Sequence, residues 1–227
     1  VFGIVRLILF ANKNKMQLII PVSLLVLFVG LQFYSNYDAV NQRGNFIYED
    51  YTKSILNTLP KNSIVFSYQW DYFISASYYF QLVESYRKDV VVIDKELLRR
   101  SWYYNQLNVN HPKLLSRLKP EVDQFIEALK PFEREEQYNA NLLDNLFRKI
   151  MTGLVSTNIE KHDYFIAPEI VDGEMKRGEF QLPEGYTLVP HLLLFKVVNS
   201  SDYAEAPLPE FEIRFDKKDD KYITSLK

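Results

Sequence analysis

The stretch Ile64–Asp94, IVFSYQWDYFISASYYFQLVESYRKDVVVID, decides the fold. Its first residues, Ile64–Phe66, form a short apolar run that predicts a buried strand. Ser75–Ser85 then predicts a helix, and the β-branched run Val90–Ile93 predicts a second strand that ends at Asp94. A strand, a helix and a strand within about 30 residues are typical of a βαβ unit, whose strands are parallel.

Further elements are predicted on both sides of this unit. Apolar residues at helical spacing and aromatic-rich runs predict helices at Phe46–Leu59, Glu96–Leu107, Glu121–Leu129 and Asn139–Val155. Three further strands are predicted, at Tyr164–Ala167, within Leu188–Val198 and at Phe211–Phe215. Pro190 interrupts the second of these runs, which therefore belongs at a sheet edge. The fold class expected is α/β, a small and mostly parallel sheet flanked by helices.

The stretch Met16–Tyr34 contains no charged residue. As a helix it would be roughly 28 Å long, close to the hydrocarbon thickness of a bilayer, so it predicts a transmembrane helix. Basic residues within Arg6–Lys15 precede it and Asp38 follows it, an asymmetry that places residues after about 37 outside the cytoplasm. The domains expected are a membrane segment at 1–35 and an extracytoplasmic α/β domain at 36–227.

The apolar run Val1–Phe10 is too short to cross a bilayer alone. We interpret it as the end of an earlier transmembrane helix, joined to the next by a cytoplasmic turn at Ala11–Lys15. The first alternative is a signal peptide with Arg6, Lys13 and Lys15 as its charged region, although no small-x-small cleavage site follows. A second alternative for Met16–Tyr34 is a buried core helix.

Composition excludes several classes of function. The chain of 227 residues has a net charge of −2 and no long basic run, so a nucleic-acid partner is not expected. Cysteine is absent, which excludes disulfides and thiolate metal sites. His111, His162 and His191 lie far apart in the sequence, so no metal site is expected. The nucleotide-binding and serine-hydrolase motifs are also absent, and no cofactor is expected.

Candidate binding residues follow the first predicted strand. Ligands of open parallel sheets lie beyond the carboxyl ends of the strands, where Gln69, Trp70 and Asp71 are found. Trp70 is suited to stacking on a sugar ring, while Gln69 and Asp71 can hydrogen-bond hydroxyl groups. The structural alternative is that Trp70 fills the edge of the core and Asp71 caps the following helix.

A second candidate pair, Arg99 and Arg100, follows the second predicted strand. Together with the aromatic run Trp102–Tyr104, these cations are suited to an anionic lipid head group or a phosphate. The alternative is ion pairing on solvated helix faces with Glu96, Asp94 or Glu84. Asp94 and Glu96 are too close in sequence for a separated acid and base of the glycosidase kind, and no catalytic residue is assigned.

Five runs of residues resemble the DUF2723 family. They are Asn57–Phe66, Gln69–Tyr72, Tyr78–Gln81, Tyr86–Ile93 and Lys95–Tyr103. The resemblance extends over Asn36–Leu107 and continues weakly toward the C-terminus. The family consists of bacterial multi-spanning membrane proteins related to protein O-mannosyltransferases, classed with GT-C glycosyltransferases. One departure is the Gly-Asp-x-Asp tip of many members, where this chain has Gln69-Trp70-Asp71.

The resemblance implies a transferase that moves a sugar from a polyprenyl-phosphate donor to an acceptor, expected to be protein, at the outer face of a bacterial inner membrane. The family's catalytic carboxylate lies in the first extracytoplasmic loop, for which this sequence has no counterpart. The chain would therefore be the last span and the C-terminal periplasmic domain, accessory to catalysis. Its implied partners are the bilayer, the donor, the acceptor and an upstream membrane part. The alternative is a membrane-anchored, non-catalytic interaction or scaffold domain of a membrane protein complex.

Overall fold

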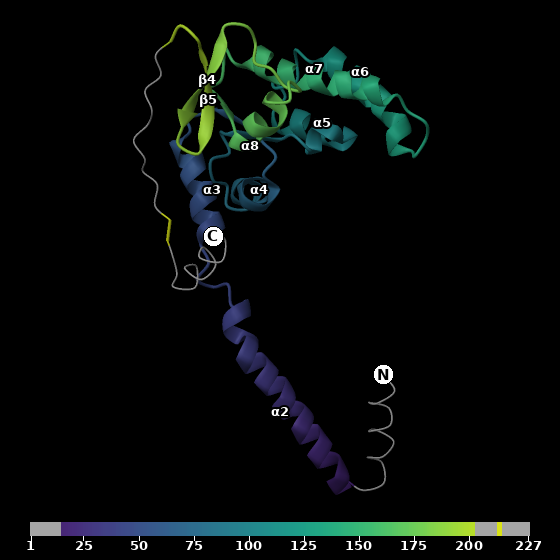
Figure 1. The fold of residues 1–227 in the computed structure, drawn as a ribbon, viewed down its shortest axis with the longest axis vertical. Coiled ribbons are helices and arrows are strands. Elements are labelled where there is room, and N and C mark those ends of the chain that lie inside the picture. The colour runs from purple at the N-terminus through teal and green to yellow at the C-terminus, as the bar shows by residue number, and fades with distance from the viewer. Residues whose placement is uncertain (1–14, 203–212, 215–227) are drawn as a thin grey trace. The chain divides into compact units, whose positions relative to one another are not determined.

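The computed structural model describes residues 15–202 and 213–214 (Figure 1). The chain divides into two compact units. One consists of residues 1–45 with 216–227, and the other of residues 46–215. The second unit contains the whole β-sheet, and we call it the α/β unit.

The described part of the first unit is dominated by the helix α2, Lys15–Val40. Its described side chains are exposed and include Gln32, Ser35, Asn36 and Asp38 in the last turns. The prediction of a transmembrane helix at Met16–Tyr34 is corrected here, because no helix among the described residues combines the length and the apolarity needed to cross a membrane. The helical conformation itself is confirmed. Val1–Phe10 lies outside the described residues.

The α/β unit alternates helices and strands along most of its length. Its helices are α3 (Ile47–Thr58), α4 (Ser75–Leu82), α5 (Ser101–Asn110), α6 (Lys119–Glu133), α7 (Ala140–Asn158) and α8 (Pro168–Ile170). Shorter helical turns are η1 (Trp70–Ile74), η2 (Leu97–Arg99) and η3 (Val171–Met175). The strands are β1 (Ile64–Ser67), β2 (Val91–Asp94), β3 (Tyr164–Ile166), β4 (Tyr186–His191) and β5 (Leu194–Asn199).

The five strands form one mixed sheet in the order β2-β1-β3-β5-β4. The strand β1 is parallel to both β2 and β3, which confirms the parallel strands predicted for the βαβ unit. The pairs β3–β5 and β5–β4 are antiparallel, so the prediction of a mostly parallel sheet is wrong.

The antiparallel part of the sheet arises because Leu188–Val198, predicted to hold one strand, folds back on itself. His191 pairs with Leu194 across the tip of the β4–β5 hairpin, and Leu192 has a φ of 55°. This left-handed conformation is rare for leucine, and the tip carries no Gly, Asn or Asp to mark a turn in the sequence. The prediction that Pro190 lies at an edge is confirmed, since β4 is the last strand of the sheet.

Helices cover both faces of the sheet, giving three layers (Figure 1). Alternate residues of a strand point to opposite faces, so Ile64 and Phe66 join one hydrophobic cluster and Val65 joins another. The first cluster includes buried residues of α5, α6 and α7, and the second includes residues of α3 and η1. The sheet is therefore packed against hydrophobic side chains on both of its faces.

Most predicted helices are confirmed, with one division. The predicted helix Glu96–Leu107 consists of two elements, η2 and α5, separated by the extended backbone of Arg100. The helix α7 begins after Asn139, whose side chain accepts a hydrogen bond from Leu142 N at 3.0 Å. The strand predicted at Phe211–Phe215 lies outside the described residues except for Ile213 and Arg214, which are not in a strand.

Candidate functional site

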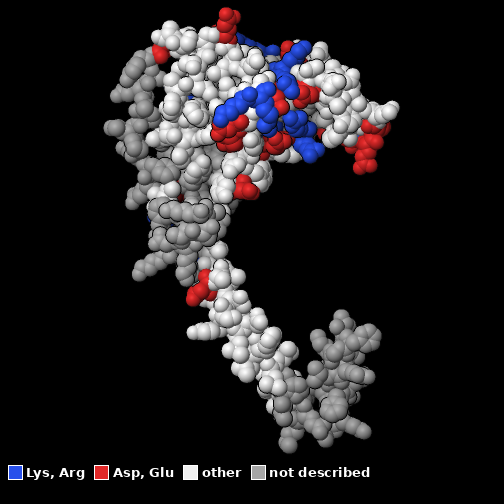
Figure 2. Space-filling view, viewed as in Figure 1, with Lys and Arg blue, Asp and Glu red and all other residues white. Residues whose placement is uncertain are grey.

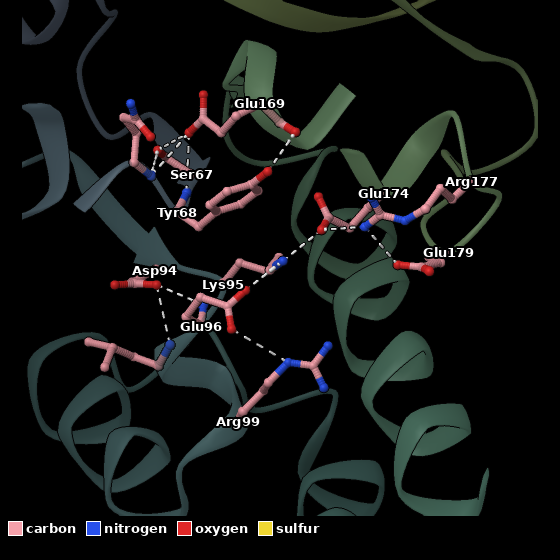
Figure 3. Close-up of polar contacts among 12 residues, drawn as sticks. Ser67, Tyr68, Asp94, Lys95, Glu96, Arg99, Glu169, Glu174, Arg177 and Glu179 are labelled. Atoms are coloured by element: carbon pink, nitrogen blue, oxygen red, sulfur yellow. Dashed lines mark hydrogen bonds and ion pairs between the residues drawn. The ribbon is translucent and has the colours of Figure 1, made fainter. Parts of the chain in front are cut away.

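The parallel strands β1, β2 and β3 end at one edge of the sheet, which we call the carboxyl edge. The turn after β1 carries Tyr68 and Gln69, the turn after β2 carries Lys95, and the turn after β3 leads to Glu169. Figure 3 shows how the polar side chains of these turns converge. Parallel strands place their following loops side by side, which is why residues far apart in the sequence meet here.

Glu169 fixes the turn that follows β1. Its Oε1 accepts hydrogen bonds from Ser67 Oγ at 2.5 Å and from the backbone N–H groups of Tyr68 and Gln69 at 3.2 Å each. The hydroxyl of Tyr68 in turn donates to the backbone carbonyl of Glu169 at 3.2 Å. Because four hydrogen bonds join the two loops, the position of the residues after Gln69 is set by a carboxylate a hundred residues away.

Lys95 forms a buried ion pair at the centre of this edge. Its Nζ lies 2.6 Å from Glu174 Oε1, 2.6 Å from Glu96 Oε1 and 4.2 Å from the ring centroid of Tyr68. Burial by itself lowers the pKa of Lys95, but hydrogen bonds to Glu174 and Glu96 outweigh it and raise the pKa above its ordinary value. The ammonium group therefore remains charged at neutral pH.

The ion pair extends into a network on both sides. Arg177 Nη2 lies 3.2 Å from Glu174 Oε1 and 3.1 Å from Glu179 Oε2. On the other side, Arg99 Nε lies 3.7 Å from Glu96 Oε2. Three cations thus face three carboxylates, and Figure 2 shows basic and acidic side chains intermixed on this face of the α/β unit.

The balanced charges indicate a structural role for this network. Each cation has a carboxylate partner, and the Lys95–Glu174 pair is screened from water by burial. A buried charge that is already paired is a poor acid or base, because changing its protonation leaves its partner unpaired. We therefore read the network as a rigid frame that holds the turns after β1 and β2, rather than as a catalytic centre.

The predicted residues Gln69, Trp70 and Asp71 lie where this frame ends. Gln69 precedes η1 and its backbone carbonyl accepts from Phe73 N and Ile74 N. Trp70 is 49 % exposed, so it does not fill the core. Asp71 is exposed and makes no hydrogen bond or ion pair with any residue that the structure describes, so it does not cap a helix. Both side chains are thus available to a ligand.

Arg99 and Arg100 differ in their surroundings. The guanidinium carbon of Arg99 lies 3.9 Å from the ring centroid of Phe147, and its Nε forms an ion pair with Glu96, as the structural alternative expects. A role of Arg99 in binding stays a prediction. The side chain of Arg100 is exposed and has no ionic partner among residues 15–202 and 213–214. No described hydrogen bond, ion pair or ring contact joins either arginine to Gln69, Trp70 or Asp71.

A chain of aromatic side chains connects Trp70 to the end of β2. Trp70 packs edge-on against Tyr78, with ring centroids 6.3 Å apart and planes at 74°. The hydroxyl of Tyr78 lies 2.9 Å from that of Tyr103, which accepts from Asp94 N at 3.1 Å. Burial raises the pKa of Tyr103 to about 12, so both hydroxyls are neutral and act as hydrogen-bonding groups.

Sequence reasoning missed Glu169, Glu174 and Arg177. Lys95 directly follows a predicted strand and was therefore visible as an edge residue. Glu174 and Arg177 lie in the charged segment Gly173–Gly178, and only the fold brings this segment to Lys95. Within the described part of the chain, no group of three His, Asp or Glu side chains is placed to hold a metal ion.

Comparison with known proteins identifies one matching family model and two relatives that we report here. Residues 48–113 match the family model described as TMEM260-associated domain 2. The chain is similar to "Protein O-mannosyl-transferase TMEM260" of Mus musculus, with 32 % identity over 77 residues. It is also similar to "Protein O-mannosyl-transferase tmem260" of Dictyostelium discoideum, with 28 % identity over 90 residues. No solved structure matches the chain.

These matches cover a minor share of each protein. They take in 34 % and 40 % of this chain, and 11 % of the length of each relative. They show that part of this chain is similar to part of two proteins named as protein O-mannosyl-transferases. They do not support the narrower assignment to the bacterial DUF2723 family, because both relatives are eukaryotic and carry the TMEM260 name.

Proposed function

We propose that the α/β unit is an accessory domain of a glycosyltransferase that moves a sugar from a polyprenyl-phosphate donor to a protein. In this proposal its carboxyl edge contacts the acceptor or the donor, and catalysis belongs to another part of the full-length protein. The observation that carries the proposal is the family match at residues 48–113. That range contains β1, η1, α4, β2, η2 and α5, and hence the turns that present Trp70 and Arg100.

The physical support for this proposal is that different residues of the carboxyl edge hold the turns and face the solvent. The ion-pair network and Glu169 hold the turns in place, whereas Trp70 and Asp71 project from them without ionic partners among the described residues. An exposed indole beside a free carboxylate is suited to the apolar face and the hydroxyl groups of a sugar or a hydroxyl-bearing peptide. A rigid frame keeps these groups ordered before the ligand arrives, which reduces the entropic cost of binding.

The test is the double substitution Trp70→Ala/Asp71→Ala in the full-length natural protein. We expect the initial rate of sugar transfer to an acceptor protein to fall about tenfold, as for the loss of roughly 1.4 kcal/mol of binding. The thermal unfolding midpoint should fall no further than in the matched control variant, because Asp71 is exposed and half-exposed Trp70 loses one ring contact, to Tyr78. The matched control is Glu136→Ala/Tyr138→Ala, another exposed acid and aromatic, which should leave the rate unchanged.

Two results would reject this function. Equal transfer rates for Trp70→Ala/Asp71→Ala and wild type would remove the carboxyl edge from substrate contact. Complete absence of sugar transfer by the full-length protein would favour the second reading, a non-catalytic interaction or scaffold domain. A larger fall in the unfolding midpoint of Trp70→Ala/Asp71→Ala than of the control variant would instead assign Trp70 and Asp71 to structural support.

The location implied by the DUF2723 resemblance, the periplasmic side of a bacterial inner membrane, stays a prediction. This chain contains no cysteine, so Lys113→Cys on its exposed surface provides a unique thiol in a full-length protein whose other cysteines, if any, are replaced by serine. A membrane-impermeant maleimide should label this variant in intact cells. Labelling that requires cell lysis would place the domain on the cytoplasmic side.

A further inference from the structure

A groove of about 310 Å³ runs beside β2 in the α/β unit. Its walls come from α4, which contributes Gln81 and Leu82, and from α5, which contributes Gln106 and Asn110. Val92 of β2 lies between these walls. No residue of the ion-pair network lines the groove. Tyr78 does line the groove and also contacts Trp70, so the groove adjoins Trp70.

The strand β2 forms one edge of the sheet among the described strands. Val91 N and Lys95 N donate to Ser63 O and Ser67 O at 2.9 Å each, so residues 91, 93 and 95 turn their backbone groups toward β1. In a parallel ladder the intervening residues turn theirs the opposite way. The N–H and C=O groups of residues 90, 92 and 94 therefore point away from β1, and of these residues Val90 and Val92 line the groove.

Side chains of the α/β unit already hydrogen-bond one backbone group each of Val90 and Asp94, the residues on either side of Val92 that point away from β1. Gln81 Nε2 donates to Val90 O at 2.8 Å, and Asp94 N donates to the Tyr103 hydroxyl at 3.1 Å. Val92 lies between them, and no described side chain bonds its N–H or C=O. Unpaired donor and acceptor groups on an edge strand are a template for another extended chain. Because Gln81 and Tyr103 already bond the backbone groups of Val90 and Asp94, such pairing is restricted to Val92.

The lining of the groove determines the shape and the charge of a ligand that fits it. Val92 is only 4 % exposed, so a ligand must reach it with a slender group, such as a peptide main chain between two outward-pointing side chains. Lys88 is the one charged residue of the lining. Burial lowers the pKa of His111, which leaves that imidazole neutral at pH 7. A neutral or acidic segment is therefore favoured over a basic one.

We propose that this groove docks an extended, neutral or acidic polypeptide segment whose main chain hydrogen-bonds the N–H and C=O of Val92. Strand addition of this kind combines main-chain hydrogen bonds with pockets for alternate side chains. At Tyr78 the groove adjoins Trp70. The identification of this polypeptide as the acceptor of sugar transfer rests on the proposed function, whereas the docking itself rests on the groove alone.

The test measures binding of a defined peptide to the full chain by fluorescence anisotropy. The probe is a fluorescein-labelled peptide of alternating Thr and Val with one central Glu. We expect saturable binding that weakens about tenfold when alternate amides are N-methylated, since an N-methyl group removes the donor of a strand pair. Replacing the central Glu by Lys should also weaken binding, and Lys88→Glu should reverse this preference.

Paired variants on α5 locate the site. Asn110→Trp places an indole in the groove and should weaken binding about tenfold. Val109→Trp is the control, because Val109 is 69 % exposed on the same helix and does not line the groove. The docking proposal is overturned by equal affinity of the two variants, by equal affinity of the N-methylated peptide, or by the absence of saturable binding at about 1 mM peptide.

The outcomes separate docking from sugar transfer. Peptide binding with a transfer rate that is insensitive to Trp70→Ala/Asp71→Ala would keep the docking site and reject the proposed function. A sensitive transfer rate without peptide binding would keep the proposed function and reject the docking site.

Discussion

Glu169 illustrates at the scale of one residue how a distant carboxylate shapes the candidate site. Its Oε1 is the shared acceptor for Ser67 Oγ and two backbone N–H groups of the turn after β1. Ser67 is fully buried, so loss of this acceptor leaves its hydroxyl without the bond that satisfies it. The turn that presents Trp70 therefore depends on a side chain outside the βαβ unit.

The variant Glu169→Ala should lower the free energy of unfolding by about 2–3 kcal/mol, the cost of leaving buried donors unsatisfied. Glu169→Gln should cost less, because its amide oxygen still accepts hydrogen bonds. Urea denaturation followed by tryptophan fluorescence measures both values. Glu160→Ala, at an exposed position, is the control and should change stability by about 0.5 kcal/mol or less. Equal stabilities of Glu169→Ala and the control would contradict this role.

The contribution of the Lys95–Glu174 pair to stability is a second matter at the scale of single residues. Burying two charges costs free energy even when they pair. Lys95→Met should destabilise the protein by about 3 kcal/mol, since it leaves Glu174 buried beside Arg177 alone. The double variant Lys95→Met/Glu174→Met should lose less stability than Lys95→Met, because no uncompensated charge remains. Thermal denaturation of wild type, Lys95→Met, Glu174→Met and the double variant tests this cycle. Additive losses would show that the two charges act independently.

At the scale of elements, Arg214 is bound to α3 by hydrogen bonds and an ion pair to Asp50, which together we call the Arg214–Asp50 clasp. Arg214 donates from its backbone N to Asp50 Oδ2 at 2.8 Å, and its Nη2 lies 2.5 Å from Asp50 Oδ1. The hydrogen bond from Arg214 lowers the pKa of Asp50 against the opposing effect of burial. Arg214 is in this way attached to α3, the first helix of the α/β unit.

The pH dependence of stability should report this clasp. A lowered pKa in the folded state means that Asp50 contributes stability above its unfolded pKa of about 3.9, and that this contribution is lost as the pH falls through the folded value. The difference in unfolding midpoint between wild type and Arg214→Ala should therefore be largest near neutral pH and should shrink below about pH 4. Arg134→Ala, at an exposed position without a described ion pair, should show a pH-independent difference. A constant difference for Arg214→Ala would contradict the ionic clasp.

At the scale of the whole α/β unit, two hydrophobic clusters share one sheet. Ile150 of α7 belongs to one cluster and Leu56 of α3 to the other, and both are fully buried. The strands between them contribute alternate residues to each cluster, so neither cluster can lose its packing while the sheet stays intact. The unit is expected to unfold as one cooperative body.

Ile150→Ala and Leu56→Ala should each destabilise the unit by about 2–5 kcal/mol while preserving a single transition. Far-UV circular dichroism and tryptophan fluorescence should give the same urea midpoint in each variant. Leu142→Ala, which truncates a half-exposed side chain on α7, is the control and should cost about 0.5 kcal/mol. Separate transitions for the two probes would show that the clusters unfold independently.

The elements that sequence reasoning predicted are those whose signals are local. The spacing of apolar residues in Asn139–Val155 predicts α7, and the β-branched run at Val90–Ile93 predicts β2. The hairpin β4–β5 was missed because Leu192 and Leu193 carry no turn signal, and the predicted membrane span was not supported by the described helix. At the site, the exposed Trp70 and Asp71 were visible as residues that follow a strand, and their role in binding stays a prediction.

By itself, the sequence determined the α/β class, the parallel pairing of β1 with β2 and the position of Trp70 at the end of a strand, because periodicity and breaker residues act over a few neighbours. Only the tertiary structure decided that β3 returns beside β1, that Glu169 and Glu174 meet residues about 80 to 100 positions earlier in the chain, and that β2 is left at an edge beside a groove. These features depend on which strands become neighbours. That choice follows from the burial of both sheet faces together, a property of the folded unit and not of any single segment.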